Sequence, residues 1–176
     1  MKLIVVAGMP GAGKEEFLNA AMGLDIPFIR MGDLVRELYP NRSADDKELT
    51  LGQFANIERE RHGYNIWAKR ALERMDGPIY LIDGCRSMDE VQAYRSLTDD
   101  VIIVAIHAPP KVRYDRLVKR QRDDAPKNLD EFNARDAREM GWGLADVIAL
   151  SDHLIVNDGP LEDFRRAASD YLRSIA

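Results

Sequence analysis

The chain has 176 residues, of which 45% are hydrophobic and 31% are charged, so its size and composition are typical of one globular domain. Twenty-five Lys and Arg residues stand against 30 Asp and Glu residues, which gives a formal net charge of −5. A net negative protein repels nucleic acids and anionic membranes, so we expect neither as a partner and expect any binding of phosphate groups to be local.

The cysteine and histidine content and the apolar runs exclude further classes. The single cysteine, Cys85, cannot form an internal disulfide, and the three histidines lie far apart in the chain, which argues against a structural zinc site. The longest purely apolar run, residues 101–106, is far shorter than the roughly 18 residues that indicate a membrane span. We therefore expect a cytoplasmic protein.

Five short apolar runs predict strands, and they alternate with segments of helical periodicity. The strands are expected at residues 3–7, 26–29, 79–83, 101–108 and 153–156. Helical spacing covers residues 15–22, 44–75, 89–97, 110–120, 130–150 with a break near Gly141 and Gly143, and 160–175. Such alternation is typical of a three-layer α/β sandwich around a parallel sheet.

Two connections are longer than ordinary crossovers. A charged helical insert at about residues 31–75 lies between the second and third strands. An insert of this kind indicates a subdomain that covers a substrate. Residues of about 121–134 begin with a short polar segment, which indicates a small mobile lid. We expect residues 1–176 to form one domain that carries both.

A phosphate-binding loop follows the first strand directly. Its sequence fits G-x-x-x-x-G-K, in which glycines let backbone N–H groups surround a phosphate chain while the lysine supplies a positive charge. A Rossmann site is excluded because Glu16 stands where its third glycine belongs. A plain glycine turn with a surface lysine is the remaining alternative. The expected nucleotide-binding residues are Gly8, Met9, Pro10, Gly11, Ala12, Gly13 and Lys14, with Glu15 and Glu16 after them.

One position departs from the usual form of this loop. Glu15 stands where a Ser or Thr ordinarily binds Mg²⁺. Direct metal binding by a loop hydroxyl is therefore not expected, and binding of a metal has to be explained in another way.

The loop resembles that of adenylate kinases, which read G-x-P-G-x-G-K-G-T and also lack a hydroxyl directly after the lysine. This resemblance extends over nearly all of the chain. It implies ATP and Mg²⁺ as cofactors, with a water shell around the metal, and a P-loop NTPase fold of the nucleoside monophosphate kinase type with strand order 2-3-1-4-5. Together, residues 83–87, 135–139 and 151–159 most closely resemble archaeal adenylate-kinase-related proteins. The last segment is also similar to the end of dephospho-coenzyme A kinases.

Two segments of this resemblance concern the acceptor. Residues 31–36 resemble T-G-D-M-L-R of adenylate kinases, which suggests Arg36 as a clamp for the acceptor phosphate. Residues 83–86 resemble D-G-F-P-R, which implies Arg86 at the acceptor and Asp83 in the water shell of the metal. The position of Asp83 at the end of an apolar strand supports a site residue independently, because the carboxyl ends of parallel strands face the ligand crevice.

Further arginines surround the predicted lid. Residues 116–120 resemble E-R-I-x-G-R, which implies Arg116 on the adenine ring and Arg120 at the donor phosphates. Arg135 and Arg138 follow the lid, and we expect one of them to reach the transferred phosphoryl group. For any of these arginines, a surface ion pair is the alternative.

For two residues of the insert, Asp33 and Arg59, the sequence allows two different roles. Asp33 either acts at the substrate or caps the helix that starts at Leu34, since aspartate is a favoured N-cap residue. Arg59 is a candidate substrate-binding residue, but it lies in a run of charges that is typical of a solvated helix face.

The residues together indicate ATP-dependent phosphoryl transfer to a small nucleotide-like acceptor, catalysed by Lys14, Arg120 and Arg135 or Arg138. One alternative is transfer to a ribose hydroxyl, as in dephospho-coenzyme A kinases, with Asp33 as the general base. Another is a nucleotide-binding switch that hydrolyses ATP slowly and has no small acceptor. The sequence does not determine the oligomeric state.

Overall fold

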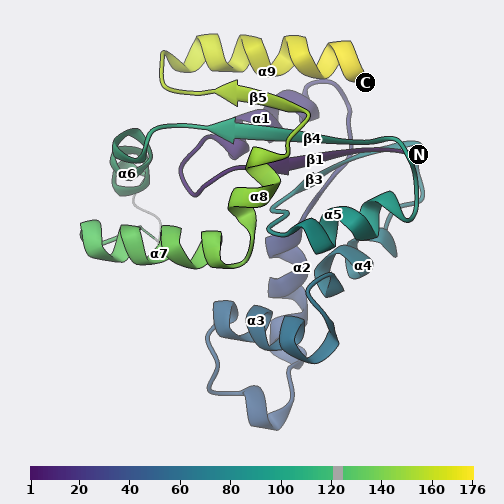
Figure 1. The fold of residues 1–176 in the computed structure, drawn as a ribbon, viewed down its shortest axis with the longest axis vertical. Coiled ribbons are helices and arrows are strands. Elements are labelled where there is room, and N and C mark those ends of the chain that lie inside the picture. Colours follow the sequence, from purple (N-terminus) through teal and green to yellow (C-terminus); the bar gives the residue numbers. More distant parts are fainter. Residues whose placement is uncertain (121–124) are drawn as a thin grey trace.

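The computed structural model describes residues 1–120 and 125–176 and contains one five-stranded sheet (Figure 1). The first four residues of the predicted lid, 121–124, lie outside the described part. All strand pairs are parallel, and the strand order 2-3-1-4-5 confirms the predicted topology. The strands are β1 (Lys2–Ala7), β2 (Phe28–Arg30), β3 (Ile79–Asp83), β4 (Val101–His107) and β5 (His153–Val156).

Alternate residues of the central strand β1 face the two helical layers. Leu3 and Val5 pack with α2 (Met31–Leu38), α4 (Ile66–Leu72), α5 (Met88–Arg95) and α8 (Leu144–Ala149). Ile4 and Val6 pack with α1 (Lys14–Met22) and α9 (Leu161–Ile175), which lie together on the other face (Figure 1). Because both faces are covered, the strand is apolar throughout, which explains the continuous run in the sequence and confirms the three-layer sandwich.

The insert is helical, as predicted, but the long helix expected over residues 44–75 is wrong. A short 3₁₀ turn, Ala44–Asp46, precedes α3 (Leu51–His62), which starts with a capping box between Thr50 and Gln53. Gly63 follows with φ of 97°, a conformation that interrupts the helix before α4 begins. Trp67 of α4 is fully buried and donates its indole N–H to the carbonyl of Ala55, so the two helices pack as a hairpin.

Helix α2 starts earlier than the sequence suggests. Its first residue is Met31 and its N-cap is Arg30, the last residue of β2. Asp33 therefore lies in the first turn of α2 and does not cap the helix, so that interpretation is wrong. The apolar Met31 is buried against β3 and α5, and this packing explains why the strand runs directly into the helix.

Between β4 and β5, the described residues form α6 (Pro110–Lys119), α7 (Leu129–Gly141) and α8. The predicted break at Gly141 and Gly143 is confirmed, since Gly143 has φ of 99° and precedes α8. In the described residues, no helix has both the length and the apolar character that a membrane crossing requires.

Candidate active site

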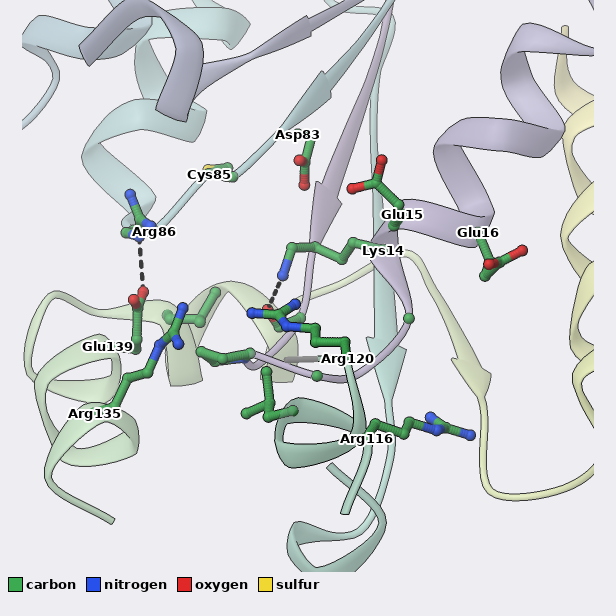
Figure 2. A pocket seen from close by; sticks show the side chains of 17 residues that line it. Lys14, Glu15, Glu16, Asp83, Cys85, Arg86, Arg116, Arg120, Arg135 and Glu139 are labelled. Carbon is green, nitrogen blue, oxygen red and sulfur yellow. Dashed lines mark hydrogen bonds and ion pairs between the residues drawn. The ribbon is translucent and has the colours of Figure 1, made fainter. Parts of the chain in front are cut away.

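The phosphate loop borders a cavity of about 410 Å³ at the carboxyl ends of β1 and β3 (Figure 2). Gly8 follows β1 and Asp83 ends β3, so the topology brings two distant predicted segments to one edge. Helices α6 and α7 border the same cavity. Its lining includes Gly8, Pro10, Gly11, Gly13, Lys14, Glu15, Glu16, Asp83, Arg86, Arg116, Arg120, Arg135 and Glu139. Met9 and Ala12 are absent from this lining and pack into the two cores.

Lys14 lies at the centre of this cavity, where its ammonium donates to the Gly8 carbonyl at 2.7 Å. Burial lowers the pKa of Lys14, whereas the nearby carboxylates Asp83 and Glu139 act to raise it. A cation with little access to water interacts strongly with an arriving anion. Lys14 is therefore placed to bind phosphate oxygens, as the loop pattern predicts.

Asp83 is a partly buried carboxylate at the same edge. Among the described residues, no hydrogen-bond partner is found for its buried Oδ1 atom. Burial raises the pKa of Asp83, and the cations Lys14, Arg30 and Arg86 oppose this rise. An oxygen without a partner beside a phosphate loop matches the hard oxygen ligands that Mg²⁺ and its bound waters require, so this site fits the predicted metal.

Glu15, the residue in the place of the usual hydroxyl, lines the cavity and pairs with Arg30 at 2.7 Å. Arg30 is adjacent to Asp83 in the β2–β3 register, so the sheet itself brings this arginine to the loop. Glu16 instead points to α9, where it pairs with Arg165 at 2.8 Å. The pair with Arg30 balances the charge that Glu15 adds near the phosphate site.

We expect Glu15→Gln to change the free energy of unfolding by less than about 1 kcal/mol, because the ion pair with Arg30 is partly exposed. Glu15→Ser restores the usual hydroxyl and should raise the affinity for Mg²⁺ modestly. Urea unfolding and titration with Mg²⁺ and ATP check both results. Abolished activity in Glu15→Gln would contradict them and would assign Glu15 a catalytic or metal-binding role.

Arg86 lines the cavity, as expected, but it has a carboxylate partner that the sequence analysis missed. Its Nε donates to Glu139 of α7 at 2.7 Å (Figure 2). Burial alone would raise the pKa of Glu139, but the charge and hydrogen bond of Arg86 outweigh burial and hold that pKa below its usual value. Glu139 is therefore an ionised residue that fixes Arg86 beside the loop.

The arginines around the predicted lid separate into two groups. Arg116, Arg120 and Arg135 line the cavity with the loop, and Figure 2 shows Arg120 directed toward the loop from α6 and Arg135 reaching from α7. Arg138 lies elsewhere, in a second cavity. The geometry therefore favours Arg135 over Arg138 for the transferred phosphoryl group.

The two predicted acceptor residues at the start of the insert lie outside both cavities. Arg36 and Asp33 form an ion pair at 2.5 Å within α2, and their side chains are 64% and 61% exposed. The spacing of three residues explains this pair, because such side chains are neighbours on a helix. Arg36 therefore does not share the cavity that Arg86 lines, and an acceptor clamp made of these two residues stays a prediction.

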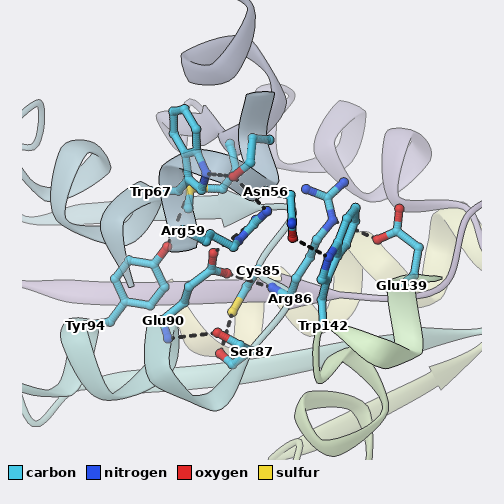
Figure 3. A network of polar contacts seen from close by, with 12 residues as sticks. Asn56, Arg59, Trp67, Cys85, Arg86, Ser87, Glu90, Tyr94, Glu139 and Trp142 are labelled. Atoms are coloured by element: carbon cyan, nitrogen blue, oxygen red, sulfur yellow. Dashed lines mark hydrogen bonds and ion pairs between the residues drawn. The ribbon is translucent and has the colours of Figure 1, made fainter. Parts of the chain in front are cut away.

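Arg59 is buried, so the solvated-face interpretation is wrong. Its side chain is 3% exposed and pairs with Glu90 of α5 at 3.5 Å, while its guanidinium lies 5.2 Å from the ring centre of Trp142 (Figure 3). Arg86 lies at the same distance from that ring. Arg59 therefore joins the insert to the loop that carries Arg86.

The second cavity, of about 650 Å³, lies between α3 and the end of α7. Trp142 lines it and donates its indole N–H to Asn56 of α3, and Arg138 lies 5.7 Å from the ring centre of Trp142. Arg86 contacts this same ring and lines the first cavity, so it lies between the two sites. The remaining lining residues are Leu49, Thr50, Gly52, Gln53 and Ile57.

Two further residues contact the loop from behind, and sequence reasoning gave neither of them a role. Arg113 of α6 is buried, donates to the carbonyl of Pro10 at 3.1 Å and forms a two-point ion pair with Asp136 of α7. Asn157, just after β5, donates to the carbonyl of Ala12 at 2.8 Å. In the sequence, the segment around Asn157 was recognised only through a resemblance to known families.

Comparison with known proteins identifies the family. A family model described as an AAA domain matches residues 4–141. A UPF0200 protein of Thermoplasma acidophilum is 41% identical over 163 residues, covering 92% of this chain and 90% of that protein. One from Hyperthermus butylicus is 40% identical over 173 residues, covering 97% and 92%. The chain belongs to the UPF0200 family. The archaeal part of the predicted relationship is thus confirmed, whereas a specific relationship to adenylate kinases stays a prediction.

Solved structures show that this UPF0200 protein shares its fold with P-loop kinases. Shikimate kinase from Bacteroides thetaiotaomicron superposes with a TM-score of 0.65 at 16% identity, covering 98% of this chain and 97% of that one. TT1252 from Thermus thermophilus gives 0.64 at 16% identity, covering 99% and 98%. At this identity the likeness concerns the fold alone.

Proposed function

We propose that this UPF0200 protein transfers the terminal phosphoryl group of ATP, with Mg²⁺, to a small nucleotide-like acceptor such as a nucleoside monophosphate. The observation that carries this proposal is the cavity in which the phosphate loop, Lys14 and four arginines meet. Phosphoryl transfer spreads negative charge over the oxygens of the moving group, and fixed cations stabilise that charge. The four arginines that line this cavity are Arg86, Arg116, Arg120 and Arg135.

The roles follow from position. The loop and Lys14 hold the donor phosphates, while Arg120 and Arg135 approach from α6 and α7 and meet the transferred group. Asp83 would hold the waters of Mg²⁺, and this ion would neutralise charge on the donor phosphates. Glu139 keeps Arg86 in place beside the acceptor.

The second cavity supplies space for the acceptor. Trp142, Gln53 and Asn56 offer a ring surface and amide groups, which suit a heterocyclic base. Arg86 lies between this cavity and the loop, so it can hold the anionic end of the acceptor near the donor. Arg138 adds a second cation at this side.

A panel of acceptors tests the proposal. The purified protein is mixed with ATP, Mg²⁺ and nucleoside monophosphates, dephospho-coenzyme A or small hydroxyl compounds, and phosphorylated product is measured against free phosphate. We expect product with a nucleotide-like acceptor. Release of free phosphate with every acceptor would contradict the kinase proposal and favour a nucleotide-dependent switch.

Asp33→Asn separates a phosphate acceptor from a hydroxyl acceptor. A phosphate oxygen is already anionic and needs no base, so we expect a fall in turnover of about tenfold at most, against the roughly 10²–10⁴-fold loss of a missing general base. The exposed position of Asp33 beside Arg36 agrees with the smaller effect. A thousandfold fall in turnover at unchanged stability would favour the hydroxyl acceptor and a base role for Asp33.

A further inference from the structure

Four carbonyl groups of the phosphate loop accept hydrogen bonds from within the protein. In the described part of the chain, Lys14 donates to the carbonyl of Gly8, the Ala12 N–H to Met9, Arg113 to Pro10, and Asn157 to Ala12. The same set of hydrogen bonds includes none from the N–H of Gly11 or Gly13. These four carbonyls thus have partners within the protein, while the N–H groups of Gly11 and Gly13 are available to a ligand.

The geometry of the peptide bond links these two facts. In a planar trans peptide, the C=O of one residue and the N–H of the next point in opposite directions. A donor behind the loop that binds the carbonyl of Ala12 therefore directs the N–H of Gly13 away from itself. Asn157 is this donor, at 2.8 Å.

Asn157 is itself fixed in one orientation. Its side chain is buried, its Oδ1 accepts from Arg116 Nη2 at 3.1 Å, and its main-chain carbonyl accepts from Arg116 Nη1 at 3.1 Å. A guanidinium only donates and a carbonyl only accepts, so the amide must present its oxygen to Arg116 and its NH₂ to Ala12. The two neighbours together leave no alternative rotation of this amide.

The last glycine of the loop, Gly13, is in direct contact with Asn157. Gly13 has φ of 115°, and a Cβ built on it would lie 2.2 Å from Asn157 Nδ2. Such a distance is far below van der Waals contact, so only glycine permits this approach of the amide to the backbone. The glycine of the motif and Asn157, 144 positions further along the chain, therefore form one structural unit.

We propose that Asn157 is a positioning residue of the phosphate loop, which turns the N–H of Gly13 toward the bound phosphate chain. This inference rests on the proposed nucleotide-dependent function. Asn157 contacts the loop and Arg116 and acts on the ligand through them. Because Arg116 lines the cavity and holds Asn157, occupation of the donor site by nucleotide and the orientation of the loop are coupled through this pair.

Asn157→Asp tests the inference with a side chain of the same shape. An aspartate places an oxygen without a proton opposite the Ala12 carbonyl. The peptide between Ala12 and Gly13 then loses the hydrogen bond that directs the Gly13 N–H toward the phosphate. Calorimetric titration with inorganic tripolyphosphate should show binding weakened by about tenfold to a hundredfold, the effect of one hydrogen bond to a charged group. Asn19→Asp, which adds the same charge on the exposed face of α1, is the control and should bind like the wild type.

A second measurement distinguishes positioning from loss of structure. In ¹⁵N-labelled protein, tripolyphosphate should shift the amide resonances of Gly11 and Gly13 in the wild type. In Asn157→Asp the shift of the Gly13 resonance should be lost. The shift of the Gly11 resonance should remain, because Arg113 still binds the Pro10 carbonyl of the peptide that carries the Gly11 N–H. If Asn157→Asp does not fold, Asn157→Ala removes the same donor without a new charge and should give the same selective loss.

The outcomes separate the two proposals. Equal binding of tripolyphosphate by the wild type and a folded Asn157 variant, or an unchanged response of Gly13, would overturn the role of Asn157 and leave the proposed function intact. A wild type that binds neither tripolyphosphate nor ATP would overturn both.

Discussion

Lys14→Ala is expected to lower the rate of phosphoryl transfer by about 10²–10³-fold or more, the effect of removing a fixed positive group from the transition state. The ammonium lies among the loop, Asp83 and Glu139, and burial lowers its pKa. Water cannot supply the positive charge that the alanine variant lacks. The stability of the protein should change little, because the hydrogen bond lost to the Gly8 carbonyl is offset by relief of a buried charge.

Initial rates with ATP and the best acceptor of the panel, together with urea unfolding, check this prediction. Lys111→Ala is the matched control, because Lys111 is an exposed residue of α6 that pairs with Asp115 and lies outside the two cavities. The control should keep the rate of the wild type. A rate close to that of the wild type in Lys14→Ala would contradict the assignment of the phosphate loop.

The sheet could be predicted because its signals are local. Continuous apolar runs such as that of β1 follow from burial on both faces, and the loop pattern identifies the strand that precedes it. The helix break at Gly63 was missed, because the segments before and after it, Leu51–His62 and Ile66–Leu72, both suit a helix and Gly63 separates them with φ of 97°. Element boundaries thus depended on backbone conformations that residue types do not determine.

Part of the site could also be predicted, because its residues stand next to local signals in the sequence. Lys14 and Asp83 stand next to strand ends, so topology alone brings them together. Asn157 contacts Ala12 across 145 residues, and its role depends on an amide orientation that only the fold reveals. Arg36, chosen by resemblance, has a carboxylate three residues away, and that local partner keeps it on the surface of α2.

Asp83→Asn should affect activity and stability in opposite directions. In the proposed site Asp83 acts on the metal through water, so its neutralisation should lower activity or metal affinity by about tenfold to a hundredfold. Its pKa in the folded state is raised, so the folded protein holds the proton more strongly than the unfolded chain does. Asp83 therefore makes the wild type lose stability as the pH rises past the ordinary aspartate value of about 4 and through the raised value.

The asparagine variant does not titrate and escapes this loss. Urea unfolding between pH 4.5 and pH 8 should show the variant gaining stability relative to the wild type as the pH rises, with the gain complete once Asp83 of the folded wild type is ionised. Asp115→Asn, on the exposed face of α6, should show no such gain. A variant that is less stable than the wild type at pH 8 would mean that Lys14, Arg30 and Arg86 stabilise the ionised carboxylate more than burial opposes it. A variant that is more stable than the wild type at pH 8 would show that the carboxylate of Asp83 destabilises the folded chain. Its position beside the phosphate loop then indicates that the carboxylate is kept for function.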